Sequence, residues 1–372
     1  MDMTERVDVM SCDHTNLNGY HQDEKSPALP RRLTDLMFGF CASQAMFAAC
    51  EVGIFDALHD AGRPLSAAAL SQKLSINNDA TCRILDALSC MELLNKHEEG
   101  TYSNTSIATK HLTTTSPHSI NCSMAFGNNV LYRLFGNLTW AVREGTNQWN
   151  RSFNKSSARD FFKEIFDNEK SCIRFMEGMR GTCRPAAKAV VTAFNLSGYQ
   201  HMCDLGGCTG DIAYAACTAY PDMKITVLDL PQVVDCSSQF APSVKECPNQ
   251  HNVSFVAGDF FQPKLPTADL YVLTHIIHDW SQEKIDILLS NIFNNLPSGG
   301  GILIGESMLK EDKSGPVYTQ FMSLLMLVIA DRGATERTGK EYRQLLEKHG
   351  FKDVQIGLAH NYIFDAVLAI KP

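Results

Sequence analysis

Apolar residues recur at helical spacing through the first half of the chain and in short continuous runs through the second half. In the first half, Ile84, Leu85 and Leu88 fall on one face of a helix. Ser66 can cap the start of another helix, because its hydroxyl can accept a hydrogen bond from the first turn. The pattern predicts a helix over 33–58, a second helix that starts at Ser66, and a third over 79–94. A hairpin over 95–113, with its turn at 98–100, follows them. Residues 116–197 are predicted to be helical, including a helix over 161–179.

From residue 201 onward, short apolar runs alternate with helical segments. One of these helices is clear, since Ile285, Leu288, Leu289 and Ile292 follow helical spacing and a glycine-rich segment over 297–301 ends it. Such alternation is typical of a mostly parallel sheet that is covered by helices on both faces, an α/β fold. The predicted strands are 201–206, 224–230, 253–257, 269–274, 301–306, 354–358 and 362–370.

Composition is that of a packed globular protein. The 372 residues are 44% hydrophobic and 20% charged, and at roughly 150 residues per domain the length suggests about two domains. The net charge of −8 argues against binding nucleic acid or an anionic membrane by bulk electrostatics. We divide the chain into a polar flexible tail over 1–28, a helical domain over 29–115, a helical linker and substrate-pocket segment over 116–197, and a sheet domain over 198–372.

The cysteines and the N-terminus point to a reducing compartment. The 13 cysteines are scattered singly, and none forms a Cys-x-x-Cys pair. The polar start of the chain lacks the apolar core of a signal peptide, and no stretch approaches the roughly 20 apolar residues of a membrane helix. We therefore expect a cytoplasmic protein with free thiols and no membrane contact.

Three helices followed by a hairpin in the 29–115 domain are a winged-helix arrangement. This scaffold either binds DNA or forms dimers. A helix that reads DNA carries several Arg, Lys, Asn or Gln residues at its exposed start. Here the candidate helix offers Arg83 together with three acidic residues, Asp79, Asp86 and Glu92. The pattern therefore favours a dimerisation module, and we expect no nucleic-acid partner.

A glycine-rich turn, Asp204-Leu-Gly-Gly-Cys-Thr-Gly210, joins the first predicted strand of the sheet to the next helix. A dinucleotide-binding turn requires Gly-x-Gly-x-x-Gly, aimed at a pyrophosphate. Here Gly206 and Gly207 are adjacent, and both Asp204 and Asp211 would repel a pyrophosphate. A cationic ligand suits this turn better, and S-adenosylmethionine is a ligand of that kind.

Further candidate residues for an adenosyl group follow the next two strands. Asp229 ends the second strand, where a carboxylate can accept hydrogen bonds from both ribose hydroxyls. Both NAD and S-adenosylmethionine enzymes use this contact, so Asp229 alone does not distinguish them. After the third strand, Gly258, Asp259 and Phe260 could offer a carboxylate to an adenine amine and a ring to its face. Each could also be an ordinary turn or cap residue, but ligands in such sheets bind at the ends of strands.

His278 follows the fourth predicted strand and faces the same edge of the sheet. A neutral imidazole, with a pKa near ~6.5, can take the proton of a phenol as a methyl group is transferred to its oxygen. Glu306 and Glu336 are the candidate partners that would hold the ring. Alternatively, His278 caps the following helix or packs on Trp280. A metal site explains the sequence less well, because His275 and His278 have no further ligands at a suitable spacing.

Over residues 33–370 the chain resembles the two-domain, S-adenosylmethionine-dependent O-methyltransferases that act on small molecules. The resemblance implies an N-terminal winged-helix dimerisation domain, a homodimer, and a class I methyltransferase domain with a Rossmann-like seven-stranded sheet. The motifs that carry it are Phe47-Ala-Ala-Cys-Glu-Val-Gly-Ile-Phe55, Cys203-Asp-Leu-Gly-Gly207, Gly258-Asp-Phe-Phe261, Ala268-Asp-Leu-Tyr271, His278-Asp-Trp280 and Glu336-Arg-Thr338.

The resemblance also assigns roles to single residues. It makes His278 the general base and Glu306 and Glu336 the acids that flank it. From the spacing of the histidines, we expect no metal. The residues that it implies for the methyl donor are Asp204, Gly206, Asp229, Gly258, Asp259, Phe260 and His275. For the acceptor, a small aromatic alcohol, it points to Asp279, Leu325 and Ile329, and we expect Met176 and Met179 to form apolar walls of the pocket.

Several positions depart from the branch of this family that methylates N-acetylserotonin, the precursor of melatonin. Leu325 and Ile329 replace an asparagine and a glutamine that bind that substrate, and His275 replaces an arginine that contacts the donor. Cys183 and Cys208 also depart from the family pattern. Two hypotheses follow. One is an enzyme that methylates a hydroxyindole or a related phenol, and the other is a weak or inactive dimer with a binding or regulatory role.

Overall fold

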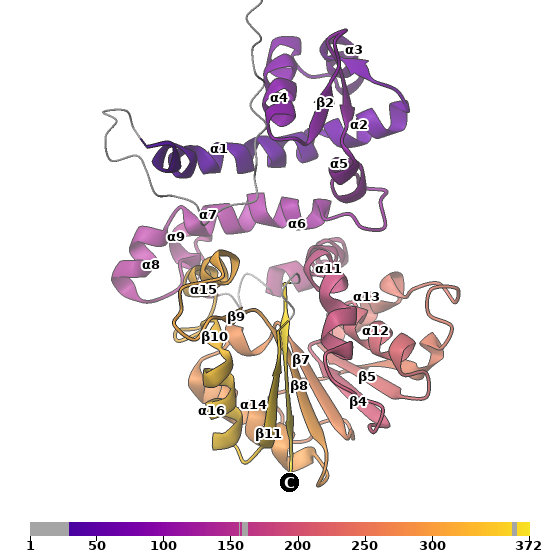
Figure 1. Ribbon diagram of the computed structural model, residues 1–372, viewed down its shortest axis with the longest axis vertical. Coiled ribbons are helices and arrows are strands. Elements are labelled where there is room, and N and C mark those ends of the chain that lie inside the picture. The colour runs from indigo at the N-terminus through magenta and orange to yellow at the C-terminus, as the bar shows by residue number, and fades with distance from the viewer. Residues whose placement is uncertain (1–29, 156, 158–162, 359–362) are drawn as a thin grey trace, which may run out of the picture.

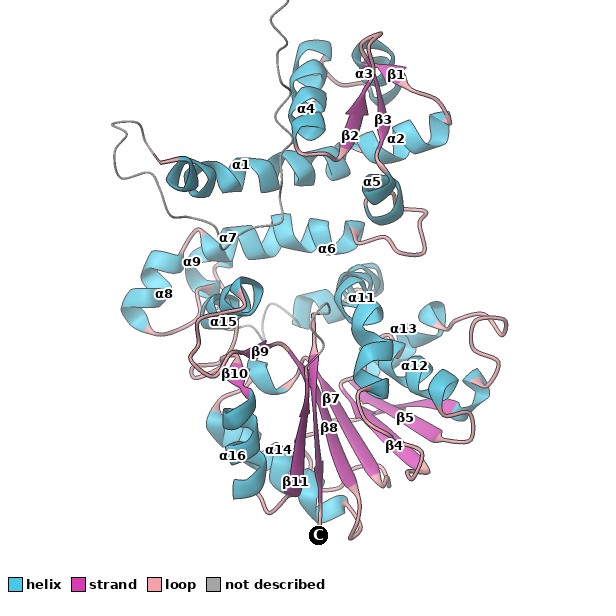
Figure 2. Cartoon of the chain, in the orientation of Figure 1, coloured by secondary structure: helices cyan, strands magenta, loops and turns pink. Residues whose placement is uncertain are grey.

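The computed structural model describes residues 30–155, 157, 163–358 and 363–372, and the tail predicted over 1–28 lies outside them. A small N-terminal lobe and a larger C-terminal lobe are joined by a layer of helices (Figure 1). Helix α1 lies beside α6 of that layer. The C-terminal lobe contains the large sheet (Figure 2).

The N-terminal lobe has the predicted winged-helix order. Its small sheet has the strand order β1-β3-β2, and the hydroxyl of Ser66 caps a helix by accepting a hydrogen bond from the backbone N–H of Ala69 at 3.2 Å. The elements are α1 (Arg31–Val52), α2 (Ile54–Ala61), β1 (Leu65–Ser66), α3 (Ala67–Leu74), α4 (Asn78–Cys90), β2 (Leu94–Lys96), β3 (Thr101–Asn104) and α5 (Ser106–His111).

Three predicted boundaries in this lobe were wrong. The helix expected over 33–58 is two helices, because Gly53 adopts a φ of +82° that residues with a Cβ rarely adopt. The helix expected over 79–94 ends at Cys90. The hairpin expected over 95–113 ends at Asn104, because Thr105 caps a further short helix through a hydrogen bond from the N–H of Ala108.

Helix α1 presents an apolar surface to solvent. More than half of the surface of each of its outward residues is exposed, and these residues are Leu33, Leu36, Met37, Phe38 and Phe40. By length and composition alone, this 22-residue helix is apolar enough to cross a membrane, so the expectation that no segment approaches that length is wrong. Composition does not distinguish such a helix from one that another protein surface covers.

The middle segment is helical, as predicted. Its elements are α6 (Asn121–Phe126), the π-helix η1 (Gly127–Leu131), α7 (Tyr132–Phe135), α8 (Leu138–Glu144), α9 (Trp149–Phe153) and α11 (Glu169–Thr192). The helix expected over 161–179 is interrupted in its described part, since α11 starts only after Asn168, whose side chain accepts a hydrogen bond from the N–H of Ser171 at 2.9 Å.

The large sheet has seven strands in the order β11-β12-β8-β7-β4-β5-β6. Strands β4 to β8 are parallel, and β12 pairs antiparallel with both β8 and β11. The seven predicted strands are confirmed to within a few residues, with Tyr362 outside the described residues. The bounds are β4 (His201–Leu205), β5 (Lys224–Asp229), β6 (Val253–Ala257), β7 (Leu270–Thr274), β8 (Gly301–Glu306), β11 (Lys352–Gly357) and β12 (Asp365–Ile370).

Helices cover both faces of this sheet. One face packs on α14 (Gln282–Asn295) and α16 (Gly339–Lys348), and the other packs on α11 and α12 (Asp211–Ala219). The carboxyl ends of the parallel strands point toward the helical layer (Figure 1). The remaining elements are α13 (Pro231–Cys236), η2 (Ser237–Phe240), η3 (Gln250–Asn252), η4 (Ile277–Asp279), α15 (Val317–Ile329) and the two-stranded ribbon of β9 (Met308–Leu309) and β10 (Arg337–Thr338).

Candidate active site

The turn after β4 requires glycine for two reasons. Gly206 has a φ of +75°, and a Cβ on it would lie 2.6 Å from Cδ1 of Ile276. The next residue is as confined, because a Cβ on Gly207 would overlap the carboxylate of Asp204. The turn therefore brings backbone N–H groups to the edge of the sheet, where a ligand can approach them closely.

Asp204 is the unpaired charge at this turn. It is buried, and neither of its carboxylate oxygens has a hydrogen-bond partner among the described residues. Burial, together with the nearby charge of Asp229, raises the pKa of Asp204 to about 7. By contrast, Asp211 pairs with the Nε of Arg180 at 3.3 Å. A buried carboxylate without a partner is costly, so Asp204 is a strong candidate to receive a cationic ligand.

Asp229, at the end of β5, is anchored to the same turn. Its Oδ2 accepts a hydrogen bond from the N–H of Cys208 at 2.8 Å, and its Oδ1 accepts one from the N–H of Leu230 at 2.7 Å. Burial raises the pKa of Asp229 to about 6, although these hydrogen bonds favour the charged form. Each oxygen keeps a lone pair for a further donor, as binding of ribose hydroxyls would require.

After β6, Asp259 stabilises its own loop. Its carboxylate accepts hydrogen bonds from the N–H of Phe261 at 2.9 Å and from Nε2 of Gln262 at 3.1 Å. This is the turn-forming role that the sequence left open. Gly258 is packed against Leu228, where a Cβ would lie 2.7 Å from Cδ1 of that leucine.

Phe260 belongs to an aromatic cluster that includes Trp280, which the sequence suggested only as a motif residue and as a packing partner of His278. The ring centroids of Phe260 and Trp280 are 6.2 Å apart, and those of Phe261 and Trp280 are 4.9 Å apart. The Nε1 of Trp280 is buried and has no hydrogen-bond partner among the described residues. The fold brings Trp280 beside Phe260 and Phe261, and the sequence did not indicate this.

These residues fit S-adenosylmethionine. The unpaired Asp204 matches a cationic ligand, and Asp229 has acceptor capacity for ribose hydroxyls. The aromatic cluster around Phe260 offers a surface for adenine. The three features lie at the carboxyl ends of β4, β5 and β6, where ligands bind in sheets of this type.

His278 lies in η4, just beyond β7, and is only 1% exposed. Its Nδ1 is 2.6 Å from Oε1 of Glu336 and 3.6 Å from Oε2 of Glu306. Its Nε2 is 3.6 Å from Oδ1 of Asp279, whose side chain is 42% exposed. The structure thus brings together the predicted histidine and both predicted glutamates, which are distant in the sequence.

Glu306 holds the backbone that carries the histidine. Its Oε1 accepts hydrogen bonds from the N–H groups of Ile276, Ile277 and His278, at 3.0, 2.7 and 3.4 Å. The side chain reaches this backbone because β7 and β8 are paired, with Thr274 opposite Gly305. Sequence reasoning assigned Glu306 to the imidazole ring, and its contact with the backbone was missed.

The buried groups of this cluster shift one another's pKa values. Burial opposes a charge on the imidazole, but Glu306, Asp279 and Glu336 together outweigh it and raise the pKa of His278 to about 10. Burial also raises the pKa of Glu306 to about 7, although the charge of His278 opposes this shift. The cluster therefore holds a proton on the ring at neutral pH when no further charge is nearby.

The same cluster could supply ligands to a metal. Single ligand atoms of His278, Glu306 and Glu336 lie within 4.8 Å of one another, a set that the sequence spacing did not reveal. However, Nδ1 of His278 is already in contact with Glu336 at 2.6 Å. This direct contact favours a hydrogen-bonded pair, and the absence of a metal stays a prediction.

The predicted acceptor residues are divided between two places. Leu325 and Ile329 of α15 lie in an apolar cluster with Trp149, whose Nε1 donates to the carbonyl of Ile329 at 2.6 Å. Met176 is fully buried in a different cluster that also contains Cys208, on the donor side. Met179, on the same helix, is partly buried.

The two cysteines that depart from the family pattern are neutral thiols. Burial, followed by the charges of Asp211 and Asp204, raises the pKa of Cys183 to about 12. Burial and the charge of Asp229 raise the pKa of Cys208 well above its usual value. Both thiols are therefore poor nucleophiles at neutral pH.

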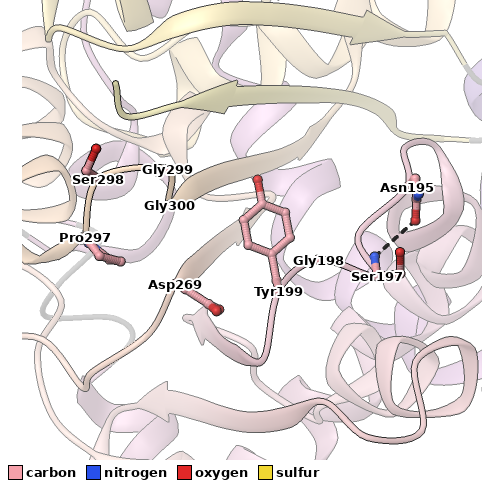
Figure 3. Close-up of a pocket in the computed structure, with 9 residues that line it drawn as sticks. All are labelled: Asn195, Ser197, Gly198, Tyr199, Asp269, Pro297, Ser298, Gly299 and Gly300. Atoms are coloured by element: carbon pink, nitrogen blue, oxygen red, sulfur yellow. Dashed lines mark hydrogen bonds between the residues drawn. The ribbon is translucent and has the colours of Figure 1, made fainter.

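A separate hollow of about 640 Å³ lies at the amino ends of the strands, opposite the site (Figure 3). Its single carboxylate, Asp269, already accepts hydrogen bonds from the N–H groups of Gln200 and His201, both at 2.9 Å. It is lined by Asn195, Ser197, Gly198, Tyr199, Asp269, Pro297, Ser298, Gly299 and Gly300. None of the predicted site residues lines it.

A parallel sheet with one antiparallel strand, an acidic glycine turn after its first strand and a ligand edge at the carboxyl ends define a class I methyltransferase. Residues 135–352 match the O-methyltransferase domain, and residues 34–114 match the O-methyltransferase dimerisation domain. The chain belongs to the S-adenosylmethionine-dependent O-methyltransferase family.

Known relatives cover nearly the whole chain. Human acetylserotonin O-methyltransferase is 40% identical over 92% of this chain and 97% of that protein. A human "probable bifunctional dTTP/UTP pyrophosphatase/methyltransferase protein" is 38% identical over 94% of this chain, which spans only 55% of that relative.

Solved structures agree with these relatives. The crystal structure of human N-acetylserotonin methyltransferase in complex with S-adenosylmethionine has a TM-score of 0.86 and 38% identity, covering 94% of this chain and 99% of that one. PigF with S-adenosylhomocysteine has a TM-score of 0.81 and 27% identity, covering 92% of this chain and 100% of that one. These relatives favour an enzyme over the inactive, binding alternative.

Proposed function

We propose that the protein transfers the methyl group of S-adenosylmethionine to the hydroxyl of a small aromatic acceptor, with His278 as the general base. The acceptor class is a hydroxyindole such as N-acetylserotonin, on which relatives at about 40% identity act by name. The observation that carries the base is the 2.6 Å contact between Nδ1 of His278 and Glu336. Because this contact engages Nδ1, Nε2 is the ring nitrogen that remains to accept the proton of the acceptor hydroxyl.

The main chemical task of the protein in this reaction is to accept the proton of the hydroxyl. S-adenosylmethionine, when bound, supplies a methyl group on a positively charged sulfur. His278 accepts the proton of the hydroxyl at Nε2 while the oxygen–methyl bond forms and the sulfur–methyl bond breaks. The imidazolium that results is stabilised by the buried carboxylates of Glu336 and Glu306. General-base help of this kind is typically worth about 10²–10⁴-fold in rate.

The ring must be neutral before it can act. In the free protein the carboxylates raise the pKa of His278 to about 10, so the ring starts as an imidazolium at neutral pH. A positive charge beside the ring disfavours that form and lowers its pKa. We therefore propose that the base becomes available only when a cationic ligand is bound, and that the ring then releases its proton to solvent.

The apolar cluster on α15 supports an acceptor with a hydrophobic body. Leu325 and Ile329 offer no side-chain hydrogen bond, and Leu325 packs within a cluster that contains Trp149. A site that lacks polar anchors does not select for a polar substituent on its substrate. We therefore propose that the acceptor is selected mainly by its hydroxyl and its aromatic ring.

The homodimer is proposed to form through the exposed face of α1. Residues 34–114 match the dimerisation domain, and this range includes most of α1. The outward Leu36, Met37 and Phe40 of α1 are each more than half exposed in a single chain. Covering this apolar surface with a second copy would stabilise the assembly.

An acceptor screen with isotopically labelled donor tests the function. Hydroxyindoles, catechols and flavonoid-like phenols are each compared with the same compound whose hydroxyl is already methylated. We expect label transfer to a hydroxyindole and none to its blocked analogue. Calorimetric binding of the donor without transfer to any acceptor would instead support the inactive hypothesis.

A further inference from the structure

His275 has an unusual backbone for a residue with a side chain. Its φ is +60°, in the left-handed region that non-glycine residues rarely adopt. The conformation is held in place because the N–H of His275 donates to the carbonyl of Gly305 at 3.0 Å. Strained residues persist where the surrounding structure fixes them, and they cluster at active sites. The strained backbone of His275 therefore points to a functional role for this residue.

The strained backbone places the ring of His275 against two other rings. Its centroid is 4.1 Å from that of His278 and 5.0 Å from that of Phe364, with tilts of 44° and 43°. Phe364 is fully buried and provides a fixed support. Among the described residues, the ring nitrogens of His275 have no hydrogen-bond partner, and its side chain contacts the rings of His278 and Phe364.

This contact restrains His278 in addition to the carboxylates. Glu306 fixes the backbone of His278, and Glu336 fixes one ring atom, Nδ1. Rotation of the ring about its Cβ–Cγ bond would break the contact of Nδ1 with Glu336, because Nδ1 lies off that axis. A second ring packed against it at 4.1 Å opposes the same rotation, and so it further limits where Nε2 points.

The charge of the pair is consistent with this arrangement. Burial lowers the pKa of His275 well below its usual value, and the charge on His278 lowers it further. His275 is therefore neutral when His278 is an imidazolium. A neutral aromatic face stabilises a neighbouring cation, whereas a second positive charge would repel it.

We infer that His275 is a positioning residue that holds the imidazole of His278 in its working orientation by packing against that ring while Phe364 supports it. This inference rests on the proposed role of His278 as the base. It differs from the role in donor contact that the family resemblance implies for position 275. The two roles predict different kinetic effects, because a positioning residue acts on turnover and a donor contact acts on donor affinity.

Three variants separate the ring from the backbone. His275→Asn removes the ring and keeps a residue that tolerates positive φ. His275→Gly removes the ring and relieves the backbone strain, so loss of folding is not expected. His275→Phe restores an aromatic ring. We would measure kcat and the acceptor KM by label transfer, and the donor Kd by calorimetry.

If the inference is right, Asn and Gly lower kcat by about tenfold or more, because small misplacement of a catalytic group costs up to about 10²-fold. The donor Kd and the acceptor KM stay within about twofold of wild type, and Phe recovers most of kcat. The inference is overturned if Asn and Gly keep the wild-type kcat, if their main effect is on the donor Kd, or if a folded Phe variant recovers no activity.

His278→Gln, measured in parallel, distinguishes this inference from the proposed function. If His278→Gln turns over as fast as wild type, the base fails and the inference about His275 fails with it. If His278→Gln is inactive while His275→Asn and His275→Gly are fully active, the base stands and only the role of His275 is overturned.

Discussion

Oε1 of Glu306 accepts a hydrogen bond from the backbone N–H of Ile277 at 2.7 Å. This contact joins the end of β8 to the turn after β7, and the same oxygen also accepts from Ile276. A buried carboxylate that accepts backbone hydrogen bonds holds a loop more firmly than a neutral group would. Glu306 therefore has a structural task as well as an electrostatic one.

Replacing Glu306 separates these two tasks. Glu306→Ala leaves at least two buried N–H groups without an acceptor, so we expect the free energy of unfolding to fall by about 2–4 kcal/mol. Glu306→Gln keeps a carbonyl oxygen of the same reach and should lose clearly less. Denaturant unfolding measures both. Equal stability of the alanine variant and wild type would contradict the role in holding the backbone.

Donor affinity is expected to rise with pH through the titration of Asp204. Burial raises the pKa of Asp204 to about 7, so below that pH the carboxyl of the free protein is largely neutral and attracts a cation weakly. Ionisation strengthens binding by up to about tenfold between about pH 6 and 8. Calorimetry over this range measures the effect.

Asp204→Asn is the matched control for that experiment. It removes the charge and keeps the size of the side chain, so the donor should bind more weakly and with a smaller pH dependence, the remainder coming from the proton that His278 releases. Donor affinity that falls as pH rises, or an unchanged pH dependence in the variant, would show that Asp204 is not the group that receives the cation.

Acceptor preference should respond to the polarity of α15. The double change Leu325→Asn with Ile329→Gln introduces amide groups into a cluster that is apolar. We expect the ratio of kcat/KM for N-acetylserotonin to that for 5-hydroxyindole to increase by about tenfold, because polar groups in a pocket select for a matching substrate group. Val317→Asn, at an exposed position of the same helix, is the control. An unchanged ratio in the double variant would remove these positions from the acceptor pocket.

Chelation should leave activity intact. The Nδ1 of His278 is engaged with Glu336, so a metal would have to break that contact to bind. Activity after dialysis against a chelator is expected to equal that of the untreated enzyme. Loss of activity that Zn²⁺ or Mg²⁺ restores would show that the His278, Glu306 and Glu336 cluster is a metal site.

Much of the sheet domain could be predicted, because alternation of buried runs and amphipathic helices is a strong local signal. Boundaries were harder where one side chain decides them. Thr105 and Asn168 each end a loop by capping a helix, and periodicity does not report this. The exposed face of α1 was missed because the apolar pattern of a helix is the same whether its own chain or a second protein covers it.

At the site, the sequence indicated which side chains follow the strands but not how they contact one another. His278, Glu306 and Glu336 were predicted as a group, whereas the bonds from Glu306 to the backbone depend on the pairing of β7 with β8. The packing of His275 on His278 depends on a positive φ at His275, which no local sequence pattern indicated. Such contacts are set by tertiary structure.

The most direct test of the account compares wild type with His278→Gln at saturating donor and acceptor, with donor affinity measured on both proteins. The account predicts that the variant transfers methyl groups at least about tenfold more slowly while it binds S-adenosylmethionine at least as tightly as wild type. A variant that binds the donor and transfers methyl groups at the wild-type rate would contradict it.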